Sequence, residues 1–507
     1  MNGAESLLRT LLDNGIDVCF MNPGTSEMQF VSALDRVPAM RGVLCLFEGV
    51  CSGAADGYAR MTGRPAATLL HLGPGLANGL ANFHNARKAR SPIVNIVGEH
   101  STQHLSYDAP LTADTALFAR TVSGWTRVVA SADRVGADAA EAVAAAIEPP
   151  GQVATLIVPA DFSWSEGGAP GGAVETPVRR PPAAERVREA ARILRGPEPA
   201  ALLLGGRALL ARGLAAAGRV TGRVFANRYA ARLERGAGLF APRRLPYFPE
   251  AAEEALARLK HLVLVESPPP VTFFGYPGRR SCPAPDDCQV HVLAAENEDG
   301  TAALEMPAAS GLLETAPPAR PALPAGAPLT AETAGMTLGA LLPEGAIVSD
   351  EMVSSGEGVW PHLAGAPPHD YLPVTGGSIG QGLPVALGAA LACPDRKVIA
   401  LEADGSGMYT LQALWTMARE RADVVTVIFA NRRYRILDIE MRRTGAGQVG
   451  PRANDMLDLA RPHLDWVRLA EGHGVAASRA STADEFIAQL RDALRERGPR
   501  LIEAQLG

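Results

Sequence analysis

The chain has 507 residues, of which 47% are hydrophobic, and a formal net charge of −6 at pH 7. This length exceeds a typical domain and predicts about three domains with ample apolar core. The small negative charge gives no reason to expect nucleic acid as a partner, and no uncharged apolar run approaches the roughly 18 residues that span a membrane. Six cysteines without a CxxC spacing indicate neither a zinc site nor a disulfide framework, which favours a reducing cytoplasm.

The N-terminal third alternates apolar strands with helices. Its first residues predict an amphipathic helix that carries charges throughout, unlike a signal peptide. Strands are expected at 17–22, 43–48, 67–72, 93–98 and 154–159. Such alternation predicts a parallel sheet covered by helices.

Two polar residues stand at the ends of these strands. Glu48 ends the second strand, and a helix of small residues is expected from Ser52 to Met61. A carboxylate at this junction is largely desolvated, which suits a group that moves protons near neutral pH; the alternative is a helix N-cap carboxylate. His71 ends the third strand directly before a glycine turn. It is either a structural residue or a proton carrier, because imidazole titrates near neutral pH.

Two segments rich in Pro, Gly and Ala, 163–184 and 316–331, are typical of linkers. They divide the chain into domains at 1–165, 184–315 and 332–507. Further strands are expected at 199–204 and 261–266 in the central domain, and at 346–350, 397–402, 424–430, 466–470 and 501–504 in the last. The sequence therefore predicts the α/β class with three doubly wound parallel-sheet domains.

The last domain contains the most informative stretch of the chain. A buried apolar strand leads into Asp404, Gly405 and Ser406, a helix follows, and a second apolar strand ends at Asn431. This order places a carboxylate and a carboxamide at neighbouring strand ends of a parallel sheet, where α/β proteins hold ligands. Their oxygens suit Mg²⁺, and the free N–H groups of the helix favour a phosphate. An ordinary buried βαβ unit is the alternative.

Taken together, these motifs resemble the thiamine diphosphate decarboxylases and acetolactate synthases, and locally they are closest to benzoylformate decarboxylase. The resemblance rests on NPGTSE at 22–27, FEGVCSGAADGYARMTGRP at 47–65, GPGLANG at 73–79 and GGSIGQGLPVALGAAL at 376–391. It extends to the spacing between Asp404 and Asn431 (431 − 404 = 27) and covers nearly the whole chain. Two positions depart from the family: Ala403 replaces the first glycine of its Gly-Asp-Gly loop, and Ala430 the first of its paired asparagines.

The resemblance implies that thiamine diphosphate and Mg²⁺ bind between the first and last domains. Asp404, Asn431 and the backbone carbonyl of Arg433 would bind the metal. Ile379 would be the bulky wedge beneath the bent cofactor, and the carbonyl of Gly377 would accept from its amino group. The implied cofactor-binding residues are Pro23, Glu48, Asn78, Ser354, Ser355, Gly377, Ile379, Asp404, Gly405, Ser406 and Asn431.

By the same resemblance, the protein is an enzyme that decarboxylates a 2-oxo acid and then protonates the resulting enamine or joins it to a second carbonyl compound. The implied catalytic residues are Glu48, which activates the cofactor, Thr25, which binds the substrate carboxylate, and His71, which protonates intermediates. Benzoylformate decarboxylase has a second active-site histidine where this chain has Phe273 and Phe274. This difference favours carboligation over simple protonation.

The family places its cofactor between two subunits, so the resemblance implies a homodimer or homotetramer in the cytoplasm. The expected partner is a small-molecule 2-oxo acid, with no nucleic acid and no membrane. Two other functions stay open on the sequence. One is a non-catalytic thiamine diphosphate-binding relic, which Ala403 and Ala430 favour. The other is a flavin or nicotinamide oxidoreductase, against which the lack of a G-x-G-x-x-G turn after the first strand counts.

Overall fold

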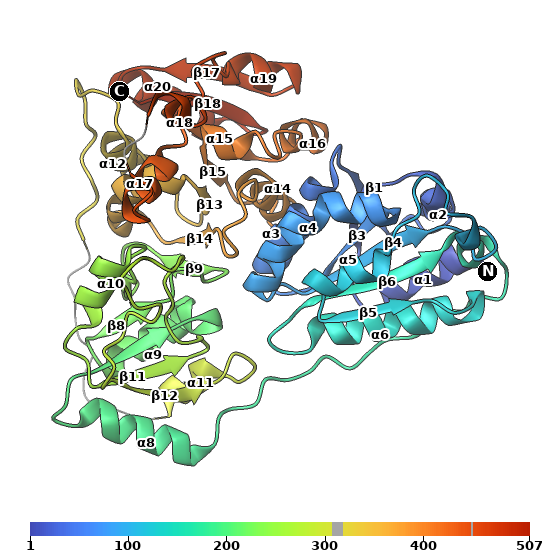
Figure 1. The fold of residues 1–507 in the computed structure, drawn as a ribbon, viewed down its shortest axis with the longest axis horizontal. Helices are drawn as coiled ribbons and strands as arrows, with labels where there is room; N and C mark the ends of the chain where they lie inside the picture. The colour runs from blue at the N-terminus through green and yellow to red at the C-terminus, as the bar shows by residue number, and fades with distance from the viewer. Residues whose placement is uncertain (307–317, 448–449, 507) are drawn as a thin grey trace.

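A computed structural model describes residues 1–306, 318–447 and 450–506. Three mainly parallel sheets covered by helices follow one another along the chain (Figure 1). The predicted α/β class with three doubly wound parallel sheets is confirmed. Within the described ranges, no helix is both long and apolar enough to cross a membrane. The six cysteines are free thiols.

The first unit is built on six parallel strands in the order β2-β1-β3-β4-β6-β5. Helices α1, α2 and α6 cover one face and α3, α4 and α5 the other, so the central strands are apolar on both sides. The strands are β1 (Val18–Asn22), β2 (Arg41–Leu44), β3 (Ala66–His71), β4 (Ile93–Glu99), β5 (Trp125–Val128) and β6 (Val153–Pro159). The helices are α1 (Gly3–Asp13), α2 (Met28–Arg36), α3 (Glu48–Thr62), α4 (Leu72–Ala89), α5 (Thr115–Val122) and α6 (Val135–Ile147).

The central unit has five parallel strands in the order β10-β8-β7-β11-β12. The two strands expected from apolar runs are present as β7 (Ala200–Leu204) and β11 (His261–Val265). The other three strands of this sheet are short or polar, so no apolar run in the sequence predicts them. These are β8 (Val224–Ala226), β10 (Arg243–Arg244) and β12 (Gln289–Ala294). The helices are α8 (Ala184–Arg195), α9 (Ala211–Val220), α10 (Pro249–Leu256) and α11 (Gly300–Glu305). The predicted domain end at 315 and linker residues 316 and 317 lie outside the described residues.

The third unit has seven strands in the order β17-β18-β16-β15-β13-β14-β9. Its last strand, β9 (Leu233–Arg235), comes from the central stretch of the chain and runs antiparallel to β14, so the sheet continues across the two units. The others are β13 (Ile347–Glu351), β14 (His369–Pro373), β15 (Val398–Ala403), β16 (Val424–Ala430), β17 (Ala476–Ala480) and β18 (Arg500–Gln505). The main covering helices are α12 (Ala331–Leu341), α14 (Gly382–Ala392) and α20 (Ala483–Arg495).

Three local expectations were wrong. β2 ends at Leu44 and does not reach residue 48. Glu48 is instead the first residue of α3, because the helix begins directly after its N-cap residue, Phe47. The helix expected after Gly405 is split into the short α15 (Asp404–Gly407) and α16 (Ala413–Glu420). Residues 466–470 form helix α19 (Trp466–Gly472) instead of a strand, since the Asp465 side chain caps the N–H of Arg468.

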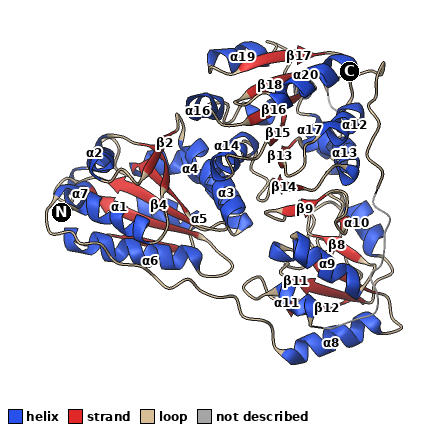
Figure 2. Cartoon of the chain, turned by 180° about the vertical axis from the view of Figure 1, so that it is seen from behind, coloured by secondary structure: helices blue, strands red, loops and turns tan. Residues whose placement is uncertain are grey.

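Helices α3 and α14 lie side by side where the first and third units meet, as both views show (Figures 1 and 2). Small residues make this close approach possible. A Cβ added at Gly388 would overlap the carbonyl oxygen of Ala54, and one at Gly57 would overlap that of Val385. The contact places the start of α3, with Glu48, and the turn before α14, with Ile379, on adjoining parts of the molecule.

Candidate active site

One group of predicted site residues lies at the carboxyl ends of β1 and β3. β1 leads through Pro23 into a single turn, η1 (Thr25–Glu27), and β3 ends at His71. Glu48 lies nearby at the start of α3 and is only 7% exposed. A Cβ at Gly75 would be 3.2 Å from Glu48 Oε1 and 3.4 Å from His71 Cβ, so these two side chains are neighbours. We call Thr25, Glu27, Glu48, His71 and Asn78 the proton cluster.

Glu48 is held by a side chain from the next helix. Asn78 Nδ2 on α4 donates to Glu48 Oε2 at 3.0 Å. Asn78 is predicted from the sequence as a cofactor contact, and in the structure its amide orients Glu48. The carboxylate is thus directed at α4 and is not the N-cap of its own helix, a position taken by Phe47. This arrangement leaves Oε1 beside Gly75 and His71.

His71 is paired with a residue that the sequence analysis did not select. Glu27 is fully buried, and its Oε2 lies 2.8 Å from His71 Nδ1. The hydrogen bond to Glu27 raises the pKa of His71 above its usual value; burial opposes this shift, and the charges of Glu27 and Glu48 add to it. NPGTSE contains the glutamate, but only the fold pairs residue 27 with residue 71. No local pattern in the sequence carries that information.

A second group lies at the carboxyl ends of β15 and β16. Ala403 pairs with Phe429 in this parallel ladder, so Asp404 and Asn431 follow neighbouring strand ends as predicted. Asp404 is 3% exposed, and its Oδ1 and Oδ2 accept from the backbone N–H groups of Gly405 at 2.9 Å and Arg432 at 2.6 Å. The side-chain oxygen of Asn431 accepts from Arg433 N at 2.9 Å. We call Asp404, Ser406, Asn431 and Arg433 the metal cluster.

The chemistry of the metal cluster fits Mg²⁺. Burial raises the pKa of Asp404 to about 6, while backbone hydrogen bonds oppose the shift. Its bonded partners are neutral amides, so a divalent cation would supply the missing positive charge. The Arg433 side chain turns away to pair with Asp438, and its carbonyl accepts one bond from Arg435 N, which leaves a second lone pair. Across the described ranges, no three or more His, Cys, Asp or Glu are grouped to hold a metal.

The two departures from the family motif change little in the local backbone. Ala403 has φ −80° and ψ 145°, an extended conformation that alanine adopts without strain. Ala430 is 3% exposed inside β16. Neither alanine displaces Asp404 or Asn431 from its strand end.

The predicted cofactor-supporting turn, residues 376–381, packs against the first unit. Gly377 has φ +77°, and a Cβ there would overlap the ring of Phe273, so both backbone and space require glycine. Ile379 is half-buried. Asn82 Nδ2 donates both to Gly380 O at 3.0 Å and to Gly49 O at 2.8 Å. One amide thus ties this turn to the residue that follows Glu48.

Strained backbone adjoins three of the predicted site residues. Leu72, Val353 and Arg432 have φ values of +55°, +50° and +57°, and they follow His71, precede Ser354 and follow Asn431. A non-glycine residue in this region costs of order 1–3 kcal/mol and persists where the surroundings enforce it. Ser354 is half-buried and Ser355 is 6% exposed in the turn after β13.

The structure does not join the two clusters within one chain. In the part of the chain that is described, no hydrogen bond or ion pair links a residue of the proton cluster to one of the metal cluster.

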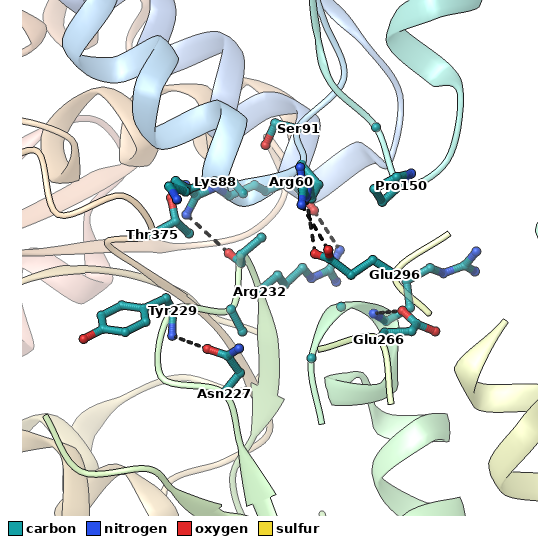
Figure 3. A pocket seen from close by; sticks show the side chains of 18 of the residues that line it. Arg60, Lys88, Ser91, Pro150, Asn227, Tyr229, Arg232, Glu266, Glu296 and Thr375 are labelled. Atoms are coloured by element: carbon teal, nitrogen blue, oxygen red, sulfur yellow. Dashed lines mark hydrogen bonds and ion pairs between the residues drawn. The ribbon is translucent and has the colours of Figure 1, made fainter. Parts of the chain in front are cut away.

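A cavity of about 1390 Å³ between the first and central units contains none of the predicted site residues. Figure 3 shows Arg60, Lys88, Arg232 and Glu266 among the residues that line it. The Glu266 carboxylate accepts from the backbone N–H groups of Arg207 at 2.7 Å and Gly300 at 2.8 Å.

Comparison with known proteins decides the family. The family model "Thiamine pyrophosphate enzyme, N-terminal TPP binding domain" matches residues 1–120, and its C-terminal counterpart matches residues 357–504. A Mycobacterium tuberculosis protein provisionally named acetolactate synthase large subunit IlvX is 53% identical over 516 residues, covering 99% of this chain and 98% of the relative. The chain belongs to the thiamine pyrophosphate enzyme family. The predicted resemblance is confirmed, and the protein is a thiamine diphosphate-dependent enzyme, a class in which Mg²⁺ is the usual metal.

Other members of this thiamine pyrophosphate family are similar along their whole length. Benzoylformate decarboxylase of Pseudomonas aeruginosa is 30% identical over 530 residues, covering 97% of this chain and 96% of the relative. Among solved structures, the thiamine diphosphate-dependent 4-hydroxybenzoylformate decarboxylase of Rhodococcus jostii RHA1 superimposes with a TM-score of 0.88 at 25% identity, covering 100% and 99% of the two chains. The oxidoreductase alternative is therefore without support.

Proposed function

We propose that the protein decarboxylates a 2-oxo acid and completes the reaction by protonating the remaining carbon. The observation that carries this proposal is that the Glu48 and His71 side chains are neighbours in the proton cluster, where the hydrogen bond to Glu27 raises the pKa of His71. Thiamine diphosphate, when bound, supplies the electron sink that makes loss of CO₂ possible. The protein supplies position and protons.

The cofactor would be held mainly by the third unit. Asp404, Asn431 and the Arg433 carbonyl are the proposed Mg²⁺ ligands, and Ser354, Ser355, Gly405 and Ser406 would donate to the phosphate oxygens. Ile379 and the Gly377 carbonyl would fix the bent ring system, with Pro23 and Asn78 contributing from the first unit. Apart from Asn78, which lies on α4, these residues lie at carboxyl ends of parallel strands or in the turns that follow them.

The first unit would handle the protons. Glu48, oriented by Asn78, would exchange a proton with the aminopyrimidine ring. Thr25 lies on the exposed side of η1 and would donate to the substrate carboxylate. His71 would donate a proton to the substrate carbon that has lost CO₂.

Carboligation is the second candidate, and one observation favours it. Phe273 packs at Gly377, and by the resemblance Phe273 and Phe274 stand in the segment where benzoylformate decarboxylase has its second histidine, so this chain lacks that proton donor. A carbon that escapes protonation attacks the carbonyl of an aldehyde or second oxo acid. The two outcomes differ only in the product.

The first experiment is a titration of the purified protein with thiamine diphosphate and Mg²⁺ by circular dichroism, followed by pyruvate, benzoylformate and 4-hydroxybenzoylformate. We expect a cofactor-dependent signal, CO₂ release from at least one acid, and an aldehyde as the main product. An acyloin as main product would favour carboligation. Cofactor binding without CO₂ release from any 2-oxo acid would contradict the proposal and favour a relic.

We further propose that the active protein is a dimer, or a dimer of dimers, whose sites form between the proton cluster of one subunit and the metal cluster of another. Large apolar side chains near both clusters are exposed in the single chain, with Leu46 46%, Tyr409 54% and Leu437 45% exposed. Such surfaces are typical of contacts with another subunit.

Mixed oligomers test this arrangement. Differently tagged Glu48→Gln and Asp404→Asn chains are co-expressed, and the mixed species is purified through both tags. If sites form between subunits, one of the two sites in a mixed dimer has all its wild-type residues and about half of the activity returns. If each site lies within one chain, both sites are damaged and no activity returns. Light scattering reports the oligomeric state, and an active monomer would contradict the proposal.

A further inference from the structure

The proposed reaction assigns no role to Glu27, although Glu27 contacts His71. It is a carboxylate with 0% exposure in η1, between β1 and α2. Buried carboxylates are rare unless they are paired, because burial disfavours their charge. The only side-chain partner that the described residues give Glu27 is His71, at 2.8 Å.

The contacts of Glu27 indicate which ring nitrogen of His71 keeps its proton when the ring is neutral. Glu27 Oε2 accepts from the backbone N–H of Gly24 at 2.8 Å, so this oxygen presents lone pairs. His71 Nδ1 approaches the same oxygen and therefore donates its proton to it. Nε2 is left on the other side of a ring that is 22% exposed. No described residue hydrogen-bonds to Nε2.

The surrounding backbone is shaped around this pair. A Cβ at Gly98 of β4 would overlap the Glu27 carboxylate, and a Cβ at Gly24 would overlap the His71 ring. Glu27 Oε1 is buried without a hydrogen-bond partner. The hydrogen bonds of this carboxylate are thus concentrated on Oε2, which contacts both Gly24 N and His71 Nδ1.

Two charged groups act on the ring from the elements packed around it, Glu27 from η1 and Glu48 from α3. Both favour the protonated imidazole, and the bond to Glu27 is the larger influence. The neutral ring keeps its proton on Nδ1, so the proton that comes and goes is the one on Nε2. A ring without Glu27 would be free to rotate or to carry its proton on the other nitrogen.

We propose that Glu27 is a positioning residue that holds Nδ1–H of His71, directs Nε2–H to the substrate, and so biases the reaction toward protonation over carboligation. The inference rests on the proposed function. In the step itself, the Nε2–H bond breaks, a C–H bond forms at the carbon that lost CO₂, and the nitrogen lone pair is reprotonated from water. No other reactant is needed.

The test compares wild type with Glu27→Gln and with a matched control, Glu99→Gln. Glu99 is also a buried glutamate at a strand end of the first unit, but it bonds to Thr115 and to the His100 backbone instead of His71. Nitrogen-15 NMR of ring-labelled histidine, with the His71 signals assigned by their loss in His71→Asn, reads the tautomer and the titration of His71 without any need for turnover.

We expect neutral His71 to carry its proton on Nδ1 in wild type and in Glu99→Gln. In Glu27→Gln its midpoint should fall, because the carboxylate that raises the pKa is gone. The basic limb of the pH–rate profile should then move to lower pH. kcat should fall by roughly 10- to 100-fold, less than the ~10²–10⁴ that proton transfer as a whole contributes, because His71 is still present, with KM changed by at most a few-fold. The ratio of acyloin to aldehyde should rise.

Two results separate the inference from the proposed function. If wild type turns over but its His71 carries the proton on Nε2, or if Glu27→Gln leaves titration and product ratio unchanged, the inference is overturned while the proposed function stands. If wild type decarboxylates no 2-oxo acid, the proposed function is overturned and the inference with it. Should Glu27→Gln fail to fold, the tautomer of wild-type His71 still decides the matter.

Discussion

The proton cluster and the metal cluster solve different problems at equivalent places, the carboxyl ends of parallel strands. In the proton cluster, side chains hold side chains: Asn78 bonds to Glu48, and Glu27 bonds to His71. In the metal cluster, backbone amides hold the side chains of Asp404 and Asn431. In the proposed reaction, side-chain identity would therefore set the position of protons in the first cluster, whereas the backbone would hold the proposed metal ligands in the second.

Glu48→Gln tests the first half of this contrast and should have the largest effect. An amide cannot exchange the required proton, so turnover should fall by about 10²- to 10⁴-fold. Cofactor affinity should change little because the metal cluster is intact. Steady-state rates and a circular dichroism titration measure the two quantities. Near-normal turnover would show that Glu48 is not the proton-exchanging group.

Asp404→Asn tests the second half and should show the opposite pattern. Losing a charged ligand removes about 1.5–3 kcal/mol, which weakens Mg²⁺-dependent cofactor binding by about 10- to 100-fold. Isothermal titration calorimetry measures the affinity, and excess cofactor should restore much of the turnover. Asp492→Asn, an exposed carboxylate of α20, is the control. If Asp404→Asn and Asp492→Asn bound the cofactor with equal affinity, Asp404 would not be a metal ligand.

Gly388→Ala asks whether the two clusters depend on the packing of α3 on α14. Its Cβ would overlap the Ala54 carbonyl, and overpacking of this kind costs about 1–3 kcal/mol. Thermal unfolding should show a lower midpoint. In Gly472→Ala the new Cβ meets no atom within 4 Å, and the midpoint should stay or rise slightly. If the unfolding midpoint were unchanged in both variants, α3 and α14 could move apart to accept the new Cβ without a loss of stability.

Asn78→Ala should have a smaller effect, confined to the proton cluster. The lost hydrogen bond is worth about 0.5–1.5 kcal/mol, so turnover should fall by about 2- to 10-fold. Asn78→Asp should be worse, since a second carboxylate would repel Glu48. Steady-state kinetics of both variants supply the order. If alanine were worse than aspartate, charge repulsion would not govern Glu48.

Ala403→Gly should have the smallest effect of all. The backbone at Ala403 is extended and needs no glycine, so the stability change should stay within about 1 kcal/mol. Cofactor affinity should be unchanged in the same titration. A large gain in affinity would mean that the departure from the family motif weakens the metal cluster.

Sequence patterns that repeat within one element predicted the fold well. The buried strands β3, β4, β6, β15 and β16 were found because both faces of a parallel sheet are covered, which requires uninterrupted apolar runs. Short or polar strands such as β10 and β17 carry no such run and were missed. The Trp466 helix was mistaken for a strand because a few apolar residues fit either period.

The sequence by itself determined the parallel α/β architecture, the family, and the placement of Asp404 and Asn431 at neighbouring strand ends. These follow from local order along the chain: apolar strand, polar turn, helix, apolar strand. Tertiary structure decided that Asn78 holds Glu48, that Glu27 holds His71, and that β9 joins the third sheet. Those are contacts between residues far apart in sequence, and they exist only because packed sheets and helices bring them within hydrogen-bonding distance.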